Sequence, residues 1–169
     1  MLKSALGGAR ILLIEDSLDN QTLIRLQLSH QGAKVLCAPD GREGILKAFS
    51  APFPDLILLD IQMPGMDGYD TIRELREKGF TRPILALTAH ALIDERRKTA
   101  AAGFNAHLTK PINPDEIIES IRQNLAAWPL KPQSPTDPAH DLPVAADSLS
   151  EATEASITAA QLSITGESD

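Results

Sequence analysis

Five short apolar runs, each followed by a segment with helical spacing, constrain the fold of this chain most. The runs are Ile11–Ile14, Val35–Ala38, Leu56–Leu59, Ile84–Leu87 and Ala106–Leu108. An apolar run of this length, bounded by turn residues, fits a strand that is buried on both faces. Alternating strands and helices build parallel sheets, because the crossover helices cover the sheet. We therefore predict an α/β domain in which helices cover both faces of a five-stranded parallel sheet.

The last helix of this alternation has the clearest start. Asn113 is a good N-cap, and Pro114 suits the first helical position because its missing N–H would lack a helical partner anyway. One apolar stripe follows, which we interpret as core packing. Its members are Ile117, Ile118, Ile121, Leu125 and Trp128.

The composition changes abruptly after Trp128. Residues 129–169 hold one lysine and seven acidic residues, and five prolines fall within the first fifteen positions. Such a polar, charged and proline-rich segment buries too little apolar surface to offset the entropy lost on folding. We predict a flexible N-terminus over 1–8, one domain over 9–128, and a mostly disordered acidic tail rich in Pro, Ala and Ser over 129–169.

Charge and cysteine content exclude several classes of function. Residues 1–128 have 15 basic and 16 acidic side chains without a basic block, which gives nucleic-acid binding little electrostatic support. The single cysteine, Cys37, cannot form an internal disulfide, which favours a reducing compartment. No apolar run approaches membrane-spanning length. We expect a cytoplasmic protein that neither binds nucleic acid nor inserts into membranes.

Polar side chains follow four of the five predicted strands. Glu15 and Asp16 follow the first, Asp60 the third, Thr88 the fourth and Lys110 the fifth. Because the carboxyl ends of parallel strands share one edge of a sheet, these groups can converge on one cleft. Three carboxylates there would repel one another unless a cation joined them. Mg²⁺ takes oxygen ligands and keeps several waters, which fits this set.

A carboxylate that attacks phosphorus forms an acyl phosphate, and catalysis of this step is mostly positioning and charge neutralisation. We predict Asp60 as the phosphoacceptor. Lys110 and the Thr88 hydroxyl would contact the transferred group. The predicted magnesium ligands are Glu15, Asp16, Asp60 and the backbone carbonyl of Gln62.

These motifs, in this order, resemble the response-regulator receiver domain of two-component phosphorelays. The resemblance covers residues 9–127 and rests on Glu15-Asp16, on Asp60 with Met-Pro-Gly-Met-Asp-Gly at 63–68, on Thr88-Ala89 and on Lys110-Pro111. It implies a flavodoxin-like (βα)₅ fold with strand order 2-1-3-4-5 and a Mg²⁺ cofactor. It also implies phosphotransfer from a sensor histidine kinase or a histidine phosphotransfer protein, and a cis peptide at Lys110–Pro111.

The resemblance assigns further roles around the acceptor. Thr88, Ala89 and Lys110 would bind the phosphoryl group and switch with it, together with His107, which stands where most members have Tyr or Phe. As a hypothesis, His107 could make the readout depend on pH, since imidazole titrates near neutrality. Gln62 and His90 would tune the lifetime of the acyl phosphate.

The resemblance also implies a mode of output. In the family, the face that corresponds to 92–102, 106–109 and 114–127 commonly reports phosphorylation. We see no second globular domain and no helix-turn-helix, and therefore expect a stand-alone receiver that signals by protein contact. The downstream target is unknown, and phosphorylation-dependent homodimerisation stays open.

Two other functions remain as alternatives. A degenerate receiver would act as an interaction module without phosphorylation. A phosphatase with an aspartate nucleophile would commonly have an acid two residues after Asp60, where this chain has Gln62, which cannot act as a general acid. We therefore expect a signalling domain rather than an enzyme, with at most self-phosphorylation and autodephosphorylation.

Overall fold

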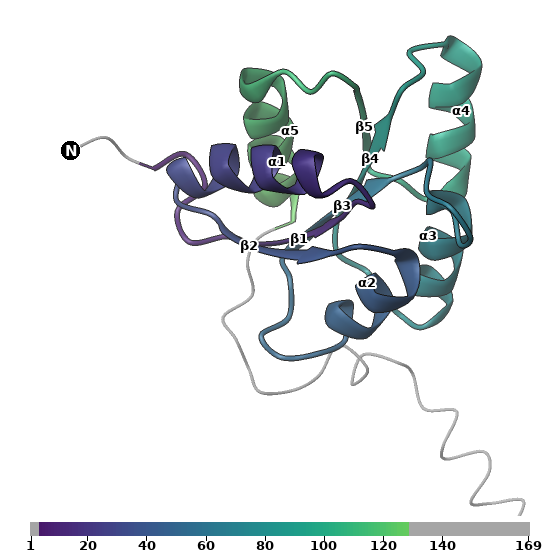
Figure 1. Ribbon diagram of the computed structural model, residues 1–169, viewed down its shortest axis with the longest axis horizontal. Helices are drawn as coiled ribbons and strands as arrows, with labels where there is room; N and C mark the ends of the chain where they lie inside the picture. The colour runs from purple at the N-terminus through teal and green to yellow at the C-terminus, as the bar shows by residue number, and fades with distance from the viewer. Residues whose placement is uncertain (1–3, 129–169) are drawn as a thin grey trace, which may run out of the picture.

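The computed structural model describes residues 4–128 and has five parallel strands in the order β2-β1-β3-β4-β5 (Figure 1). This order confirms the predicted fold class. The strands are β1 (Arg10–Ile14), β2 (Lys34–Ala38), β3 (Leu56–Asp60), β4 (Ile84–Thr88) and β5 (Ala106–Thr109). The helices are α1 (Leu18–His30), α2 (Gly41–Ala48), α3 (Gly68–Glu77), α4 (Ile93–Ala102) and α5 (Pro114–Ala127).

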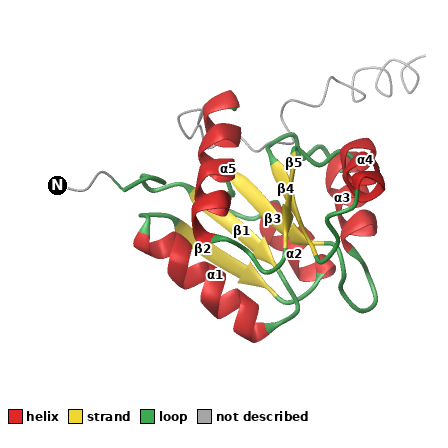
Figure 2. Cartoon of the chain, turned by 90° about the horizontal axis from the view of Figure 1, so that it is seen from above, coloured by secondary structure: helices red, strands yellow, loops and turns green. Residues whose placement is uncertain are grey.

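Successive strand residues feed two separate apolar cores, since side chains alternate between the faces of a sheet. In β1, Ile11 and Leu13 lie in one core, while Leu12 and Ile14 lie in the other. The first core is closed by α1 and α5 through Ile24, Leu28, Ile117 and Ile121. The second is closed by α2 and α3 through Ile45, Ala48, Ile72 and Leu75. Seen from above, the sheet separates α1 from α3 and α4 (Figure 2).

Several helices begin just past the carboxyl edge of the sheet and are fixed there by side-chain caps. The side chains of Ser17, Asp67 and Asn113 accept hydrogen bonds from backbone N–H groups in the first turns of α1, α3 and α5. The predicted N-cap Asn113 is thus confirmed. Helix α4 lacks a side-chain cap at Leu92, its N-cap residue. The caps hold the chain where it passes from strand to helix, which is where the polar residues of the candidate site lie.

Both ends of the domain add detail to the sequence predictions. Residues 4–8 form a turn in which the Leu6 side chain is buried in the α1–α5 core, and the Leu6 N–H donates to the Gln31 carbonyl at 2.9 Å. Burial of Leu6 is favourable, and the flexibility of 1–8 stays a prediction. Trp128 lies at the C-cap of α5 and is 37% exposed, so its assignment to the buried stripe was wrong. The predicted tail, 129–169, lies outside the described residues.

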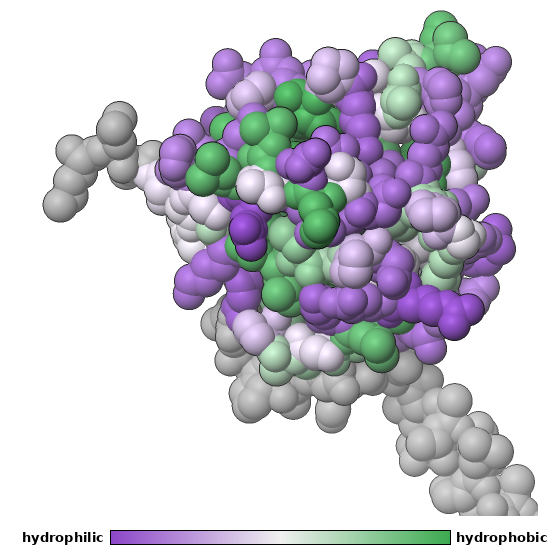
Figure 3. All heavy atoms as spheres, viewed as in Figure 1, coloured by the Kyte–Doolittle hydropathy of each residue, from purple (hydrophilic) through white to green (hydrophobic). Residues whose placement is uncertain are grey.

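Apolar side chains also reach the surface on the side of the sheet that carries α1 (Figure 3). Leu18, Leu23 and Leu26 of α1 are each more than half exposed. Leu18 is the first residue of the helix and follows the Glu15-Asp16 pair closely. Leu18 therefore exposes an apolar side chain at the carboxyl edge of the sheet, and Leu23 and Leu26 are exposed further along α1.

Gly68 is packed against the strand end that bears Asp60. Its N–H donates to the Ile61 carbonyl at 2.9 Å, and a Cβ at this position would lie 2.5 Å from Ile61 Cα and 2.6 Å from the Asp60 carbonyl oxygen. We expect Gly68→Ala to lower the free energy of unfolding by about 3 kcal/mol in urea denaturation, because backbone atoms must shift.

Gly65→Ala is the matched control for Gly68→Ala. A Cβ on Gly65 would have no atom within 4 Å, although its φ of +78° adds backbone strain. We expect this variant to lose only about 1 kcal/mol. Equal losses in the two variants would contradict the close packing at Gly68.

Candidate functional site

Asp60 ends a strand whose five residues are all buried, and the aspartate itself is only 2% exposed. Its side chain nevertheless has polar partners on both oxygens. The Gln62 N–H donates to Oδ1 at 3.1 Å, and Lys110 Nζ donates to Oδ2 at 2.9 Å. These bonds compensate the charge of a carboxylate that would otherwise be costly to bury.

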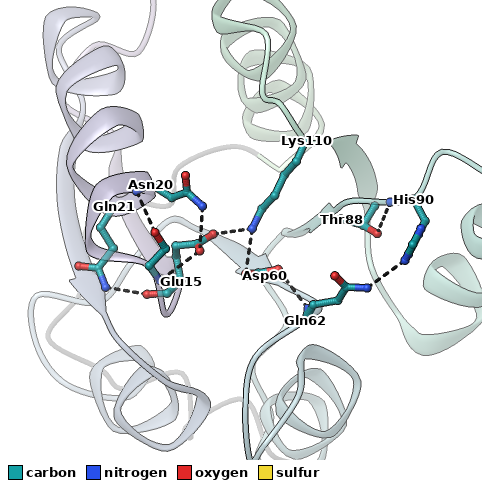
Figure 4. A network of polar contacts seen from close by, with 9 residues as sticks. Glu15, Asn20, Gln21, Asp60, Gln62, Thr88, His90 and Lys110 are labelled. Carbon is teal, nitrogen blue, oxygen red and sulfur yellow. Dashed lines mark hydrogen bonds and ion pairs between the residues drawn. The ribbon is translucent and has the colours of Figure 1, made fainter.

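Lys110 joins the ends of two strands that neighbour each other in the sheet (Figure 4). The same Nζ atom that contacts Asp60 lies 2.9 Å from Glu15 Oε2. The Lys110 backbone N–H donates to the Thr88 carbonyl at 2.7 Å. The predicted cis peptide between Lys110 and Pro111 is confirmed. One ammonium therefore neutralises part of the charge of two buried carboxylates.

Glu15 is held from the α1 side by residues that the sequence analysis did not assign to the site. Asn20 Nδ2 donates to Glu15 Oε1 at 3.2 Å, and Gln21 Nε2 donates to the Glu15 backbone carbonyl at 2.6 Å (Figure 4). The Ser17 N–H also donates to Oε1, at 3.3 Å. The sequence did contain a signal for this contact. Asn20 and Gln21 are adjacent amide residues in the first turn of the helix that follows Glu15, and that turn faces the end of β1.

Burial and the neighbouring charges shift the titration of the central pair. Burial raises the pKa of Asp60 to about 6, helped by the charge of Glu15 and opposed by the hydrogen bond from Lys110. Burial by itself would lower the pKa of Lys110, but its hydrogen bonds to Glu15 and Asp60 outweigh this and raise that pKa. Lys110 therefore keeps its proton near neutral pH, where Asp60 is mostly ionised.

Glu15, Asp16 and Asp60 each place a carboxylate oxygen within 4.8 Å of the others. Glu15 and Asp60 are buried, whereas Asp16 is exposed and opens the cluster to solvent. Three carboxylates and the Lys110 ammonium leave a formal charge of −2, which a divalent cation would balance. The donors are all oxygens, as Mg²⁺ prefers. These residues therefore fit a magnesium ion, which would supply charge neutralisation at phosphoryl oxygens.

The β4 end of the site is formed by Thr88, Ala89 and His90. Thr88 is fully buried, and its Oγ1 accepts a hydrogen bond from the His90 N–H at 3.1 Å. Ala89 and His90 are exposed. Gln62 Nε2 lies 3.0 Å from His90 Nε2, so the two residues predicted to tune the acyl-phosphate lifetime contact each other next to the end of β3 (Figure 4). The structure thus brings together Asp60, the acidic pair and the β4 end.

His107 contacts α4 and the loop before it. Its Nε2 lies 3.2 Å from the His90 carbonyl oxygen, and its Nδ1 lies 3.4 Å from Thr99 Oγ1. The Thr99 hydroxyl also donates to the Arg96 carbonyl at 3.0 Å. His107 is therefore linked to Thr88 through His90, and its role as a switch stays a prediction.

Comparison with known proteins agrees with this geometry. The model of the response regulator receiver domain family matches residues 11–122. The "uncharacterized 14.6 kDa protein in sodA1 3′ region" of Leptolyngbya boryana is 40% identical over 121 residues, which cover 70% of this chain and 92% of that protein. The sensor histidine kinase GacS of Pseudomonas protegens is 37% identical over 117 residues, 66% of this chain, but only 13% of the kinase is covered.

A solved structure extends the comparison to the metal. The receiver domain of sensor histidine kinase PA1611 from Pseudomonas aeruginosa PAO1 was crystallised with a magnesium ion coordinated in its active-site cleft. It is 37% identical, superposes with a TM-score of 0.64, and the match covers 71% of this chain and 99% of that domain. Among residues 4–128, no helix has the length and apolar character needed to cross a membrane.

Proposed function

Because the chain belongs to the response regulator receiver domain family, we propose that it accepts a phosphoryl group from a phosphohistidine donor onto Asp60 in a Mg²⁺-dependent reaction. The main support is the arrangement in which Lys110 bridges Asp60 and Glu15 while Asp16 opens the same cluster to solvent. A buried nucleophile with a fixed cation on one oxygen needs little reorganisation to meet an incoming phosphoryl group.

In this reaction, an Asp60 oxygen forms a bond to phosphorus as the bond from phosphorus to the donor imidazole breaks. The released imidazole nitrogen takes up a proton from solvent. Lys110 stays near the acceptor and contacts the negative oxygens of the transferred group. Asn20 and Gln21 keep Glu15 in place, so that the acidic pair stays beside the acceptor. The backbone carbonyl of Gln62 would complete the magnesium ligands with the three carboxylates.

Thr88 and His107 connect the site to the β4–α4 loop. Thr88 Oγ1 accepts from the His90 N–H, so its hydroxyl hydrogen would donate to a phosphoryl oxygen on Asp60, and Ala89 would offer its exposed backbone to the same group. A ligand shifts a conformational equilibrium by its differential contacts with the two states. Gln62 and His90 would control water access to the acyl phosphate and therefore its lifetime.

The proposed partners are a sensor histidine kinase or histidine phosphotransfer protein and an unidentified downstream protein. The exposed Leu18, which lies two residues after the acidic pair, supports docking of the phosphodonor at this edge of the sheet. We further propose a cytoplasmic, stand-alone receiver that signals by protein contact, with phosphorylation-dependent homodimerisation as one form of output. Any self-phosphorylation or autodephosphorylation would belong to the same site.

A phosphorylation-independent interaction module is the main rival. The rival gives no role to a third carboxylate in the cluster, yet Asp16 places an oxygen within 4.8 Å of those of Glu15 and Asp60. The phosphatase alternative needs a general acid near the acceptor. The nearby Gln62 side chain is an amide that contacts His90, which disfavours repeated turnover.

Incubation with acetyl phosphate and Mg²⁺, followed by intact-mass spectrometry, tests the proposal. We expect the wild-type protein to gain one phosphoryl group, and Asp60→Asn or chelation of Mg²⁺ to abolish the gain, because the nucleophile or the neutralising cation is lost. Asp67→Asn, which alters a helix cap in the loop after Asp60, is the matched control and should still be labelled. Labelling that survives Asp60→Asn, or no labelling of the wild type, would refute the proposal.

A further inference from the structure

Helix α4 is weakly attached to the rest of the domain. Thr99 is the only one of its ten residues that is buried, and its N-cap residue makes no side-chain hydrogen bond. Leu92 and Ile93, at its start, are each 71% exposed. An element with so little buried apolar surface is held by few contacts and opens at low free-energy cost. Its position therefore depends on the specific polar contacts that remain.

Tyr69 of α3 makes two of these contacts. Its hydroxyl donates to Glu95 Oε1 at 2.7 Å, and Lys98 Nζ lies 4.7 Å from the centre of its ring. Glu95 and Lys98 lie three residues apart on α4, so they share one helix face. The Tyr69 ring also packs edge-on against Phe104, with centroids 6.2 Å apart at an interplanar angle of 85°. Figures 1 and 2 show α4 beside α3.

Tyr69 is in turn fixed relative to the acceptor strand. It follows Gly68, whose backbone lies so close to Ile61 and Asp60 that a Cβ would not fit. The hydrogen bond from the Gly68 N–H to the Ile61 carbonyl holds this approach. The first turn of α3 and the end of β3 therefore form one rigid unit, and Tyr69 extends from that unit to α4.

We propose that Tyr69 is a positioning residue that holds α4 in its unphosphorylated place through Glu95, and that this hold opposes the rearrangement that follows phosphorylation of Asp60. The second half of this inference rests on the proposed function. Burial and the neighbouring Glu95 both raise the pKa of Tyr69, so its hydroxyl keeps its proton and remains a donor at neutral pH.

A second connection joins α4 to the site around Asp60, and it runs through Thr88. The Thr88 Oγ1 accepts from the His90 N–H, and the exposed loop over 89–92 leads directly into α4. A phosphoryl group that draws Thr88 toward Asp60 pulls on this loop and moves the start of α4. Because Tyr69 is fixed to the acceptor strand rather than to the loop, the Tyr69–Glu95 hydrogen bond is stretched by that movement.

Hydrogen exchange on the unphosphorylated protein tests the hold itself. Tyr69→Phe removes only the hydroxyl and keeps the ring against Phe104. We expect about fivefold faster exchange of α4 amides, the same effect in Glu95→Met, whose side chain has no oxygen acceptor, and little further change in the double variant, since both remove one interaction. Glu119→Gln on α5, which loses contacts within its own helix, is the control and should leave α4 unchanged. Unchanged α4 exchange in Tyr69→Phe would overturn the hold.

Binding of beryllofluoride, a phosphoryl mimic, with Mg²⁺ tests the coupling by NMR titration. Linkage requires that a contact made only in the unphosphorylated state weakens binding of the mimic. We expect Tyr69→Phe to bind beryllofluoride about fivefold more tightly than the wild type, which a purely structural role of the hydroxyl would not produce. Equal or weaker binding would overturn the coupling, whereas failure of the wild type to bind would refute the proposed function and the coupling with it. The hydrogen-exchange result on the unphosphorylated protein does not depend on either outcome of the binding experiment.

Discussion

Replacement of Lys110 by methionine should lower the free energy of unfolding of the metal-free protein by about 3 kcal/mol near neutral pH. Methionine keeps most of the stem but removes the ammonium that bridges Glu15 and Asp60, which are 1% and 2% exposed. Loss of one partner from a buried charge cluster is strongly destabilising, because uncompensated charge remains buried. Urea denaturation in a chelating buffer measures the effect.

The loss in Lys110→Met should shrink as the pH falls. Because the folded-state pKa of Asp60, about 6, lies above its ordinary value of 3.8, the folded protein binds more protons than the unfolded chain between these values. Stability therefore falls as the pH rises through this window and is recovered on acidification. Removal of Lys110 takes away a hydrogen bond that lowers the pKa of Asp60, so the window extends to higher pH in the variant.

Asp60→Asn is the matched control for this prediction. It removes a buried carboxylate rather than its counter-charge, so near neutral pH it should be at least as stable as the wild type and should lack the Asp60 part of the pH dependence. Mg²⁺ should recover part of the stability lost in Lys110→Met, because binding to the folded state alone stabilises it. A loss in Lys110→Met that is the same at pH values of about 5 and about 7.5 would contradict the electrostatic origin.

Arg76→Met should lower the free energy of unfolding by about 3 kcal/mol. Arg76 takes no part in the candidate site around Asp60. The Arg76 guanidinium donates to four neutral oxygens at 2.8 to 2.9 Å and so links the end of α3 to the loops that precede β4 and β5. Its acceptors are the carbonyls of Phe80, Arg82 and Gly103 and the side chain of Asn105. Hydrogen bonds from a charged donor contribute more than neutral ones, and a carbonyl left without its donor adds to the loss.

Arg73→Met is the control on the same helix. Arg73 is exposed and, within residues 4–128, pairs only with Asp70 at 3.4 Å, so we expect a change within about 0.5 kcal/mol. Burial lowers the pKa of Arg76, but the group stays charged at neutral pH, and Arg76→Lys should recover only part of the loss because one ammonium cannot reach all four acceptors. Urea denaturation that gives Arg76→Met and Arg73→Met the same stability would show that the four hydrogen bonds contribute little.

The sheet could be predicted from the sequence because its strands are buried on both faces. The run predicted at Leu56–Leu59 is β3 without its last residue, and the run at Ile84–Leu87 is β4 without its last residue. Both missing residues, Asp60 and Thr88, are polar groups that complete the strand, so an apolar pattern cannot include them. The convergence of the site residues followed from the topology alone, because parallel strands end at one edge.

The contacts inside the site could not be predicted in the same way. Either acid of the Glu15-Asp16 pair could have met Lys110, and only the geometry of the strand end buries Glu15 and leaves Asp16 exposed. The Tyr69–Glu95 and Arg76 contacts join segments whose distance depends on how α3, α4 and the loops pack together. The burial of Leu6 depends likewise on tertiary packing, which overrides the composition of a glycine-rich terminus.

The two apolar cores lie on opposite faces of the sheet, which separates them. A change in side-chain volume beneath α1 and α5 need not be matched by one beneath α2 and α3, because neighbouring residues such as Leu12 and Leu13 pack into different cores. Mutations on opposite sides should then combine additively. The face on which we propose that the phosphodonor docks and the helix that we propose moves, α4, can therefore change in sequence independently of each other.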